Sequence, residues 1–295
     1  MNQSKKPLVC IIVINWNGIE ESVDCLRSML KLDYSNYKII LYDNASEKNE
    51  ALELKKIFKK NKKIDFIRSE KNWGFDEGCN RGILYAKKKY NSPYYLISNN
   101  DVVVKKDFLT ELVKVLEKNP SYGGASPKIY NKENKIWWRG KVKYNPWTGR
   151  LKDDKYTNKI CETDFITGCS MLIKKEVVEK AGFLRPKFFL SGLDTLEYSL
   201  RIKRKGFKLF YVPSSVIWHL CGISAWRMHP LKRIKYELIG VIEFFKIAKW
   251  YHLPTLILSH FIGFIQLRLR SFYIFITNKG KRKKFLQTFK KFHPS

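Results

Sequence analysis

The strongest constraint on the fold is a regular repeat in the first hundred residues. Four runs of apolar and β-branched residues begin at intervals of 29, 27 and 30 residues, at Leu8, Tyr37, Ile64 and Tyr94. Segments with helical spacing of apolar residues lie between these runs. Strands that alternate with helices at this interval predict βαβ units with right-handed crossovers. The sequence therefore predicts an α/β fold with a mostly parallel central sheet flanked by helices.

The pattern changes after residue 101. A helix is predicted around 109–116, but residues 130–163 are rich in Trp, Gly, Asn and Lys and predict an irregular or meandering segment beside the sheet. Regular patterns return as a strand at 170–173, a helix at 197–205 and a strand at 209–212. The second half of the chain therefore predicts a continuation of the same sheet with less regular connections.

The last 65 residues, 231–295, differ in composition from the rest of the chain. They hold 14 Lys or Arg and two acidic residues, a net charge of 14 − 2 = +12. An apolar helical stripe occupies 234–248, and a second apolar stretch at 254–267 is shorter than the roughly 20 residues that a membrane-spanning helix needs. We predict a basic amphipathic helical tail on an anionic membrane surface; packing against the preceding domain is the alternative.

Charge and cysteine content narrow the class of protein. Lys and Arg exceed Asp and Glu by 57 − 27 = 30, which predicts an anionic partner such as nucleic acid, an anionic membrane or a phosphate-bearing substrate. Neither Gly-x-x-x-x-Gly-Lys-Ser/Thr nor Gly-x-Gly-x-x-Gly occurs, which argues against phosphate-loop ATPases and dinucleotide dehydrogenases. The six cysteines form no Cys-x-x-Cys pair and the N-terminus resembles no secretory signal, so a cytoplasmic setting is expected.

Polar loops follow each of the first four predicted strands. Their residues are Asn15-Trp16-Asn17-Gly18, Asp43-Asn44-Ala45-Ser46, Asn72-Trp73-Gly74-Phe75 and Asn99-Asn100-Asp101. Each loop alone fits an ordinary turn. A parallel sheet, however, brings the carboxyl ends of its strands to one edge, where ligands bind in open α/β folds. Together they predict a nucleotide site with phosphates near Asp101, where a hard cation would also fit.

Two further groups of residues carry possible chemistry. Asp194 and Glu197 begin a predicted helix, where carboxylates serve either as caps or as a general base for an acceptor hydroxyl. His219 ends an apolar run and is either a structural residue or a metal ligand.

The order of these motifs resembles the family-2 glycosyltransferases of the GT-A (Rossmann-like) fold, especially the rhamnosyltransferase-like branch. The resemblance covers roughly residues 7–225 and includes Asn80-Arg81-Gly82, Thr167-Gly168-Cys169 and Trp218-His219. It implies a glycosyltransferase domain over 1–230, with a nucleotide-binding half at about 7–125 and an acceptor half at about 126–230. The basic helical extension at 231–295 would follow this domain.

The resemblance also implies roles for individual residues. The nucleotide sugar would be bound by seven positions: Asn15, Asn17, Asp43, Asn72, Gly74, Asn80 and Asn100. Asp101 matches the last position of the family's metal-binding Asp-x-Asp, Asn99 takes its first position, and His219 matches a histidine that completes the metal shell. The metal would be Mg²⁺ or Mn²⁺, acting on the diphosphate leaving group.

The chain departs from the family pattern at two places. Alignment on Leu200-Arg201 puts Thr195 at the position of the catalytic carboxylate, so the base would be Asp194 or Glu197. Asp76 and Glu77 occupy positions where many relatives carry small residues, and they would repel a diphosphate unless they point away or pair with Arg81 or a lysine.

The implied function is an inverting, metal-assisted transfer of a sugar from a nucleotide-diphosphate sugar to a hydroxyl of a lipid-linked or cell-surface glycan. The enzyme would work at the cytoplasmic face of the membrane without a nucleic-acid partner. Two alternatives stay open: a catalytically altered sugar-nucleotide-binding protein of the same fold, suggested by Thr195 and Asn99, and a basic nucleic-acid-binding protein.

Overall fold

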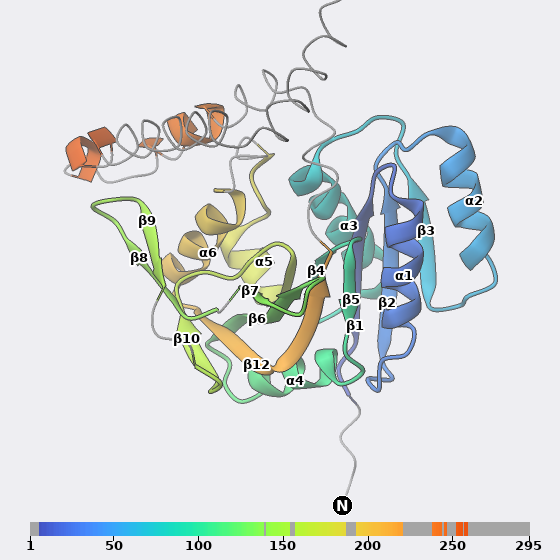
Figure 1. Cartoon of the computed structure of the whole chain (residues 1–295), viewed down its shortest axis with the longest axis horizontal. Coiled ribbons are helices and arrows are strands. Elements are labelled where there is room, and N and C mark those ends of the chain that lie inside the picture. The colour runs from blue at the N-terminus through green and yellow to red at the C-terminus, as the bar shows by residue number, and fades with distance from the viewer. Residues whose placement is uncertain are drawn as a thin grey trace, which may run out of the picture. The chain divides into compact units, whose positions relative to one another are not determined.

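A computed structural model describes residues 6–138, 140–153, 157–186 and 193–220, with 238–243, 245–246, 252–255 and 257–258 from the C-terminal region. The first hundred residues form the predicted βαβ units (Figure 1). The elements in order are β1 (Val9–Asn15), α1 (Ile19–Met29), β2 (Tyr37–Asp43), α2 (Lys48–Phe58), β3 (Ile64–Arg68), α3 (Phe75–Tyr90) and β4 (Tyr94–Asn99). β1 pairs in parallel with β2 and β4, and β2 pairs in parallel with β3, which confirms the predicted parallel sheet.

The second half of the chain extends this sheet with strands of both directions. Its main elements are β5 (Val102–Val104), α4 (Phe108–Leu116), β6 (Tyr122–Asn131), β11 (Ser170–Lys174), α5 (Lys175–Ala181), α6 (Asp194–Arg204) and β12 (Lys208–His219). With the short strand β10 (Cys161–Thr163) at one end, the strand order is β10-β12-β6-β11-β4-β1-β2-β3. β11 runs antiparallel to both β4 and β6, whereas β12 runs parallel to β6. The parallel half and the mixed half are thus one continuous sheet.

The segment predicted to be irregular contains four short strands. They are β7 (Ile136–Trp138), β8 (Val142–Asn145), β9 (Arg150–Asp153) and β10 (Cys161–Thr163). β7 and β10 add to the main sheet beside β6 and β12, while β8 and β9 form a separate two-stranded sheet. Strands of three or four residues are too short to show a clear alternation in sequence, which is why the pattern looked irregular.

Two hydrophobic layers cover the two faces of the main sheet. Alternate residues of β1 point to opposite faces: Val9, Ile11 and Val13 join α1, α2 and α4 on one side, and Cys10, Ile12 and Ile14 join α3, α5 and α6 on the other. A strand buried on both faces needs a continuous apolar run, and β1 has one. The sheet is therefore held between helices on both sides, and its strand ends carry the polar loops.

Register places three polar residues at one edge of the sheet. Asn15 lies opposite Asp43 across β1 and β2, and Ile14 lies opposite Asn99 across β1 and β4. The carboxyl ends of these strands therefore finish at the same level, as expected for a parallel sheet that carries a ligand site.

The chain divides into two compact units, residues 1–144 with 152–246 and residues 145–151 with 247–295. In the second unit the rings of Trp147 and His252 are in edge contact, with centroids 4.5 Å apart. The described part of 238–258 is largely helical, as predicted, but most of the tail, including the basic cluster at 281–284, lies outside the described residues. Among those described, no helix has the length and apolar character to span a membrane.

Candidate active site

Asn15 organises the strand ends at the nucleotide-side edge of the sheet. It is fully buried, its Nδ2 donates to Asp43 Oδ1 and to Ser46 Oγ at 3.0 Å, and its Oδ1 accepts from Ser22 Oγ at 2.9 Å. The other oxygen of Asp43, Oδ2, is buried and accepts no hydrogen bond within the described chain; Arg68 Nε lies 3.7 Å away. A buried carboxylate oxygen costs free energy until a donor reaches it. An N–H or O–H of a ligand would supply a donor to this oxygen.

Asn17 and Asn100 connect this centre to neighbouring loops. Asn17 has a left-handed backbone (φ 50°), its N–H donates to Ser46 Oγ at 2.9 Å, and its Oδ1 accepts from the Glu47 N–H at 2.8 Å. Asn100 Nδ2 lies 2.9 Å from Ser22 Oγ and 3.2 Å from Asn15 Oδ1. The structure thus brings Asn15, Asn17 and Asn100 together with Asp43 in one network.

Asn44 orders the loop that contains Asn72 and Gly74. Its Nδ2 donates to Asn72 Oδ1 at 3.0 Å and to the Gly74 carbonyl at 2.9 Å, and its Oδ1 accepts from the Trp73 N–H at 3.0 Å. Gly74 has φ 81°, a conformation that side chains disfavour, and it begins α3. Asn44 belongs to one of the polar strand-end loops, but we did not predict it as a site residue. Its position next to Asp43 at the end of β2 was the available signal.

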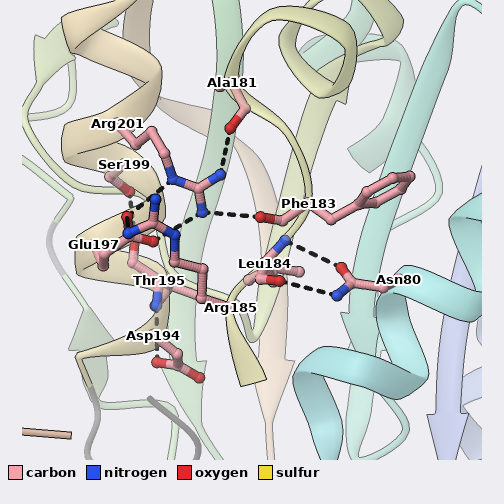
Figure 2. Close-up of polar contacts among 10 residues, drawn as sticks. All are labelled: Asn80, Ala181, Phe183, Leu184, Arg185, Asp194, Thr195, Glu197, Ser199 and Arg201. Carbon is pink, nitrogen blue, oxygen red and sulfur yellow. Dashed lines mark hydrogen bonds and ion pairs between the residues drawn. The ribbon is translucent and has the colours of Figure 1, made fainter. Parts of the chain in front are cut away.

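Asn80 lies in a different environment from the other predicted nucleotide contacts. Its Nδ2 donates to the Leu184 carbonyl at 2.9 Å, and its Oδ1 accepts from the Leu184 N–H at 3.0 Å (Figure 2). Both ends of this buried amide are thereby engaged with a segment 104 residues further along the chain. These contacts give Asn80 the structural role of fixing that segment against α3.

Asp101, Asn99 and His219 come together, although His219 lies 120 residues from Asn99 in sequence. β12 pairs with β5 so that His219 is opposite Val102, directly after Asp101. His219 Nε2 lies 3.2 Å from Asp101 Oδ1 and 3.2 Å from Asn99 Nδ2. Both side chains of the Asp101–His219 pair are largely buried, at 14% and 9% exposure.

This arrangement fits a divalent cation. Two ligand atoms that bind one Mg²⁺ or Mn²⁺ at right angles are about 3 Å apart, and a carboxylate oxygen with a neutral imidazole nitrogen matches that spacing. The described residues contain no group of three or more His, Cys, Asp or Glu placed to hold a metal. The protein would therefore supply two strong ligands, and a hard cation of this kind takes its other ligands from substrate phosphates and water.

Glu197 and Arg201 form a buried ion pair within α6. Arg201 Nε and Nη2 donate to the two Glu197 oxygens at 2.9 and 2.8 Å, and Arg185 Nη1 lies 3.3 Å from Glu197 Oε1 (Figure 2). Arg201 also donates to the carbonyls of Ala181 and Phe183. The charge of Glu197 is therefore neutralised by two guanidinium groups, and its oxygens are occupied.

Asp194 is the first residue of α6 and is held by the start of its own helix. The Thr195 N–H donates to Asp194 Oδ1 at 2.8 Å. Burial raises the pKa of Asp194, and this donor opposes that rise. A carboxyl with a raised pKa accepts a proton more readily than an ordinary aspartate, which suits a general base.

The two unexpected acidic residues at the start of α3 lie in different surroundings. Glu77 pairs with Arg81 at 2.9 Å, one of the arrangements expected to keep it from repelling a diphosphate. Asp76 is fully buried, and Asp194 is close enough to influence its carboxyl. Burial, then the charge and hydrogen bond of Asp194, then the charge of Glu197 raise its pKa well above the ordinary value. We did not predict Asp76 as a site residue; its departure from the family pattern was the signal.

Known proteins with similar sequences are enzymes of sugar transfer by name. The chain is 25% identical over 214 residues to a poly-beta-1,6-N-acetyl-D-glucosamine synthase of Staphylococcus epidermidis, covering 72% of this chain and 50% of that protein. A glycosyltransferase GlyG of Streptococcus pneumoniae is 26% identical over 37% of this chain and 35% of its own length. The chain thus spans about half the length, or less, of these curated relatives.

Two solved structures share the fold. The mannosyltransferase PcManGT from Pyrobaculum calidifontis, in complex with GDP-Man and Mn²⁺, aligns at a TM-score of 0.61 and 16% identity, over 97% of this chain and 85% of that one. GalNAc-T7 with UDP, GalNAc and Mn²⁺ aligns at a TM-score of 0.61 and 18% identity, over 79% of this chain and 47% of that one. These likenesses confirm the GT-A architecture.

The family assignment rests on the sequence itself. The family description "Glycosyl transferase family 2" matches residues 10–182, which include the strand-end loops, Asp76 and Asp101 but end before α6 and His219. Because that match covers more than half of the chain, the protein belongs to glycosyl transferase family 2.

Proposed function

We propose that this protein transfers a sugar from a nucleotide-diphosphate sugar to a hydroxyl of a glycan acceptor, with inversion at the anomeric carbon. The observation that carries the proposal is the Asp101–His219 pair, with a carboxylate oxygen 3.2 Å from an imidazole nitrogen at the sheet edge that also holds Asp43. Membership of glycosyl transferase family 2 supports the reaction class.

The donor would bind across the strand ends. The buried Asp43 Oδ2 is the acceptor for an N–H of the base or an O–H of the ribose, because Asn15 holds the other oxygen. Asp101 and His219 would hold Mg²⁺ or Mn²⁺, with Asn99 as a weaker neutral neighbour. Such a metal, when bound, neutralises the developing charge of the diphosphate leaving group. The named structural neighbours contain Mn²⁺ with UDP or GDP-Man, which supports this assignment.

Asp194 would be the general base. The residue is partly accessible to solvent, whereas the oxygens of Glu197 are engaged by Arg201 and Arg185. In the transfer, the acceptor hydroxyl oxygen bonds to the anomeric carbon while the bond from that carbon to the diphosphate oxygen breaks. The hydroxyl proton moves to Asp194, and the leaving diphosphate takes the bonding electron pair. One displacement of this kind inverts the anomeric configuration.

The acceptor would be a lipid-linked or cell-surface glycan. The named relatives include a synthase of a poly-N-acetylglucosamine polymer, which supports polysaccharide synthesis. The net charge of +30 and the basic tail support work at an anionic membrane surface, on its cytoplasmic face. Within the family, we propose the rhamnosyltransferase-like branch, which implies a rhamnosyl donor.

A catalytically altered sugar-nucleotide-binding protein is the second candidate. One observation favours it: Thr195 stands where the resemblance implies a catalytic carboxylate, and a threonine hydroxyl cannot act as that base. The two candidates differ in turnover but share donor binding.

A donor panel separates the two functions. Full-length protein with Mn²⁺ is incubated with UDP-, GDP- and dTDP-sugars and glycan acceptors, and NMR identifies the anomeric configuration of the product. We expect turnover of at least one donor with inversion, and a loss of about 10²–10⁴ in kcat for Asp194→Asn. The matched control Asp107→Asn alters a half-exposed carboxylate that pairs with Lys105 and should leave kcat unchanged. Metal-dependent donor binding without transfer to any acceptor would support the second candidate.

A further inference from the structure

The carboxyl of Asp76 is buried at the start of α3. It lies in the first turn of α3 with no solvent exposure. In the described part of the chain, neither of its oxygens accepts a hydrogen bond from an N–H or a neutral O–H group. A buried, ionised carboxylate without donors would be very costly, so a proton on Asp76 is the physical expectation.

The beginnings of α3 and α6 meet at this point. A Cβ built on Gly168 would lie 2.7 Å from Thr195 Cγ2 and 3.4 Å from the Phe75 ring. Thr195 follows Asp194 and Phe75 precedes Asp76, so the two aspartates extend from neighbouring helix starts. The two carboxyl groups are close enough for each to shift the pKa of the other. Two buried carboxylates at such range repel each other, and one proton held between them removes that repulsion.

The surrounding groups decide which carboxyl holds that proton. The Thr195 N–H donates to Asp194 Oδ1 at 2.8 Å, which favours the ionised form of Asp194. In the described part of the chain Asp76 has no such donor, and its complete burial disfavours a second negative charge. The pKa of Asp76 is accordingly raised well above the ordinary value, chiefly by burial and then by Asp194. The buried Cys79 thiol also lies on α3, and its pKa is raised by burial and then by the charges of Asp76 and Asp194.

We propose that Asp76 and Asp194 form a carboxylic acid–carboxylate dyad, in which protonated Asp76 donates a hydrogen bond that positions Asp194 as the general base. This inference rests on the proposed function for the role of the base, but the shared proton itself does not. Thr195 on α6 takes the place of the carboxylate that the family resemblance implies. In the dyad, Asp76 on α3 supplies the second carboxyl of the site instead. Its net charge is −1 before the transfer, and it becomes neutral when Asp194 takes the proton of the acceptor hydroxyl.

Infrared spectroscopy tests the shared proton without any substrate. The full chain at neutral pH, in H₂O and in D₂O, is compared with Asp76→Asn and with the control Glu77→Gln, which removes the neighbouring carboxyl that pairs with Arg81. We expect a protonated-carboxyl C=O band that shifts in D₂O, is lost in Asp76→Asn and is retained in Glu77→Gln. Absence of this band from the wild type, or its persistence in folded Asp76→Asn, would overturn the dyad.

Turnover tests the positioning role separately. The side-chain amide that Asp76→Asn introduces can still donate to Asp194, so we expect this variant to keep most of kcat and to lose the alkaline decline that deprotonation of Asp76 causes in the wild type. Asp76→Ala removes the donor and should lower kcat about 10²-fold, as expected for a misplaced reacting group. Equal kcat in wild type and folded Asp76→Ala would exclude the positioning role. If the wild type turned over no donor, the proposed function would be wrong, and the infrared result would still decide the dyad.

Discussion

At the scale of single residues, hydrogen-bond partners distinguish two kinds of buried polar side chain. Some are bonded to other parts of the protein and stabilise the fold, and others have an oxygen that is open to a ligand or a proton. Asn80 and Glu197 are both buried and fully engaged, by Leu184 and by Arg201 and Arg185. Asp43 and Asp76 each retain oxygens that no donor in the described chain reaches. Buried oxygens of this kind are uncommon in folded proteins, and they mark where ligands or protons are expected.

Asp76 makes stability depend on pH in a defined direction. Its pKa is raised in the folded protein, so the folded state binds more protons than the unfolded chain above the ordinary aspartate pKa. Its contribution is fully favourable below that pKa and is lost as pH rises through the raised value. Urea unfolding at a series of pH values should show Asp76→Asn gaining stability over the wild type as pH increases. A constant difference across the pH range would contradict a raised pKa.

Glu197 is expected to stabilise the fold rather than to act as the base. Glu197→Gln leaves the Arg201 guanidinium, 14% exposed, without a charged partner on α6, and the loss of one member of a buried ion pair costs about 3 kcal/mol. Urea unfolding measures this loss, with the surface-pair variant Glu77→Gln as control, for which about 0.5 kcal/mol or less is expected. A folded Glu197→Gln protein with unchanged stability and abolished turnover would instead identify Glu197 as the base.

The residue types of the site were predictable from the sequence, but their partners were not. Asn99, Asp101 and His219 were predicted to lie together, and the structure places His219 Nε2 3.2 Å from Asn99 Nδ2 and 3.2 Å from Asp101 Oδ1. The link between Asp76 and Asp194 depends on the starts of α3 and α6 lying together beside Gly168, and no local pattern predicts two residues more than a hundred positions apart to be neighbours. The bonds of Asn80 to a backbone 104 residues away were invisible for the same reason.

At the scale of elements, the packing of α3 on β1 positions two parts of the site at once. α3 begins directly after the Asn72–Gly74 loop and carries Asp76 in its first turn. Further along the helix, Asn80 is hydrogen-bonded to the backbone of Leu184. Gly82 faces β1 so closely that an added Cβ would lie 2.5 Å from Ile12 Cγ2. This close approach fixes the distance between α3 and the sheet, and with it the position of the start of α3 relative to the strand ends.

Gly82→Ala should therefore destabilise the protein, although Ala normally favours helices. Overpacking of this kind costs about 1–3 kcal/mol. The gain in helix propensity from Gly to Ala is about 1 kcal/mol at most, so the overpacking cost is expected to be the larger of the two. Urea unfolding provides the measurement, and Leu84→Ala, at an exposed position of the same helix, is the control. A more stable Gly82→Ala protein would show that α3 can move away from β1 without cost.

The parallel half of the sheet was predictable because its strands are long, apolar and evenly spaced. β12 was predicted only over 209–212, whereas it extends from Lys208 to His219. Its pairing with β6 shifts register between Val212 and Val216, where Pro213, Ser214 and Ser215 interrupt the apolar pattern. A bulge of this kind divides one strand into two apparent runs in the sequence. The antiparallel strand β11 was predicted as a strand, but its direction depends on the tertiary fold.

At the scale of the whole molecule, the positive charge predicts binding to anionic surfaces. The chain has a formal net charge of +30, and its last 65 residues contribute 14 − 2 = +12. Each Lys or Arg near an anionic membrane contributes about 1 kcal/mol. Flotation with vesicles should show binding to phosphatidylserine-containing membranes at low salt and release at high salt, with neutral vesicles as control. Binding to mixed-sequence DNA in preference to these vesicles would favour the nucleic-acid alternative.

The most direct test of the proposed donor site is calorimetric titration of UDP and GDP into the full chain, with and without Mn²⁺. We expect Mn²⁺-dependent binding of at least one nucleotide, at least tenfold weaker binding by Asp101→Ala, and unchanged binding by Asp107→Asn; a tenfold change corresponds to about 1.4 kcal/mol. Binding that is equally tight without Mn²⁺, or in Asp101→Ala, would contradict a metal held by Asp101 and His219 and with it the central claim of how this site engages its donor.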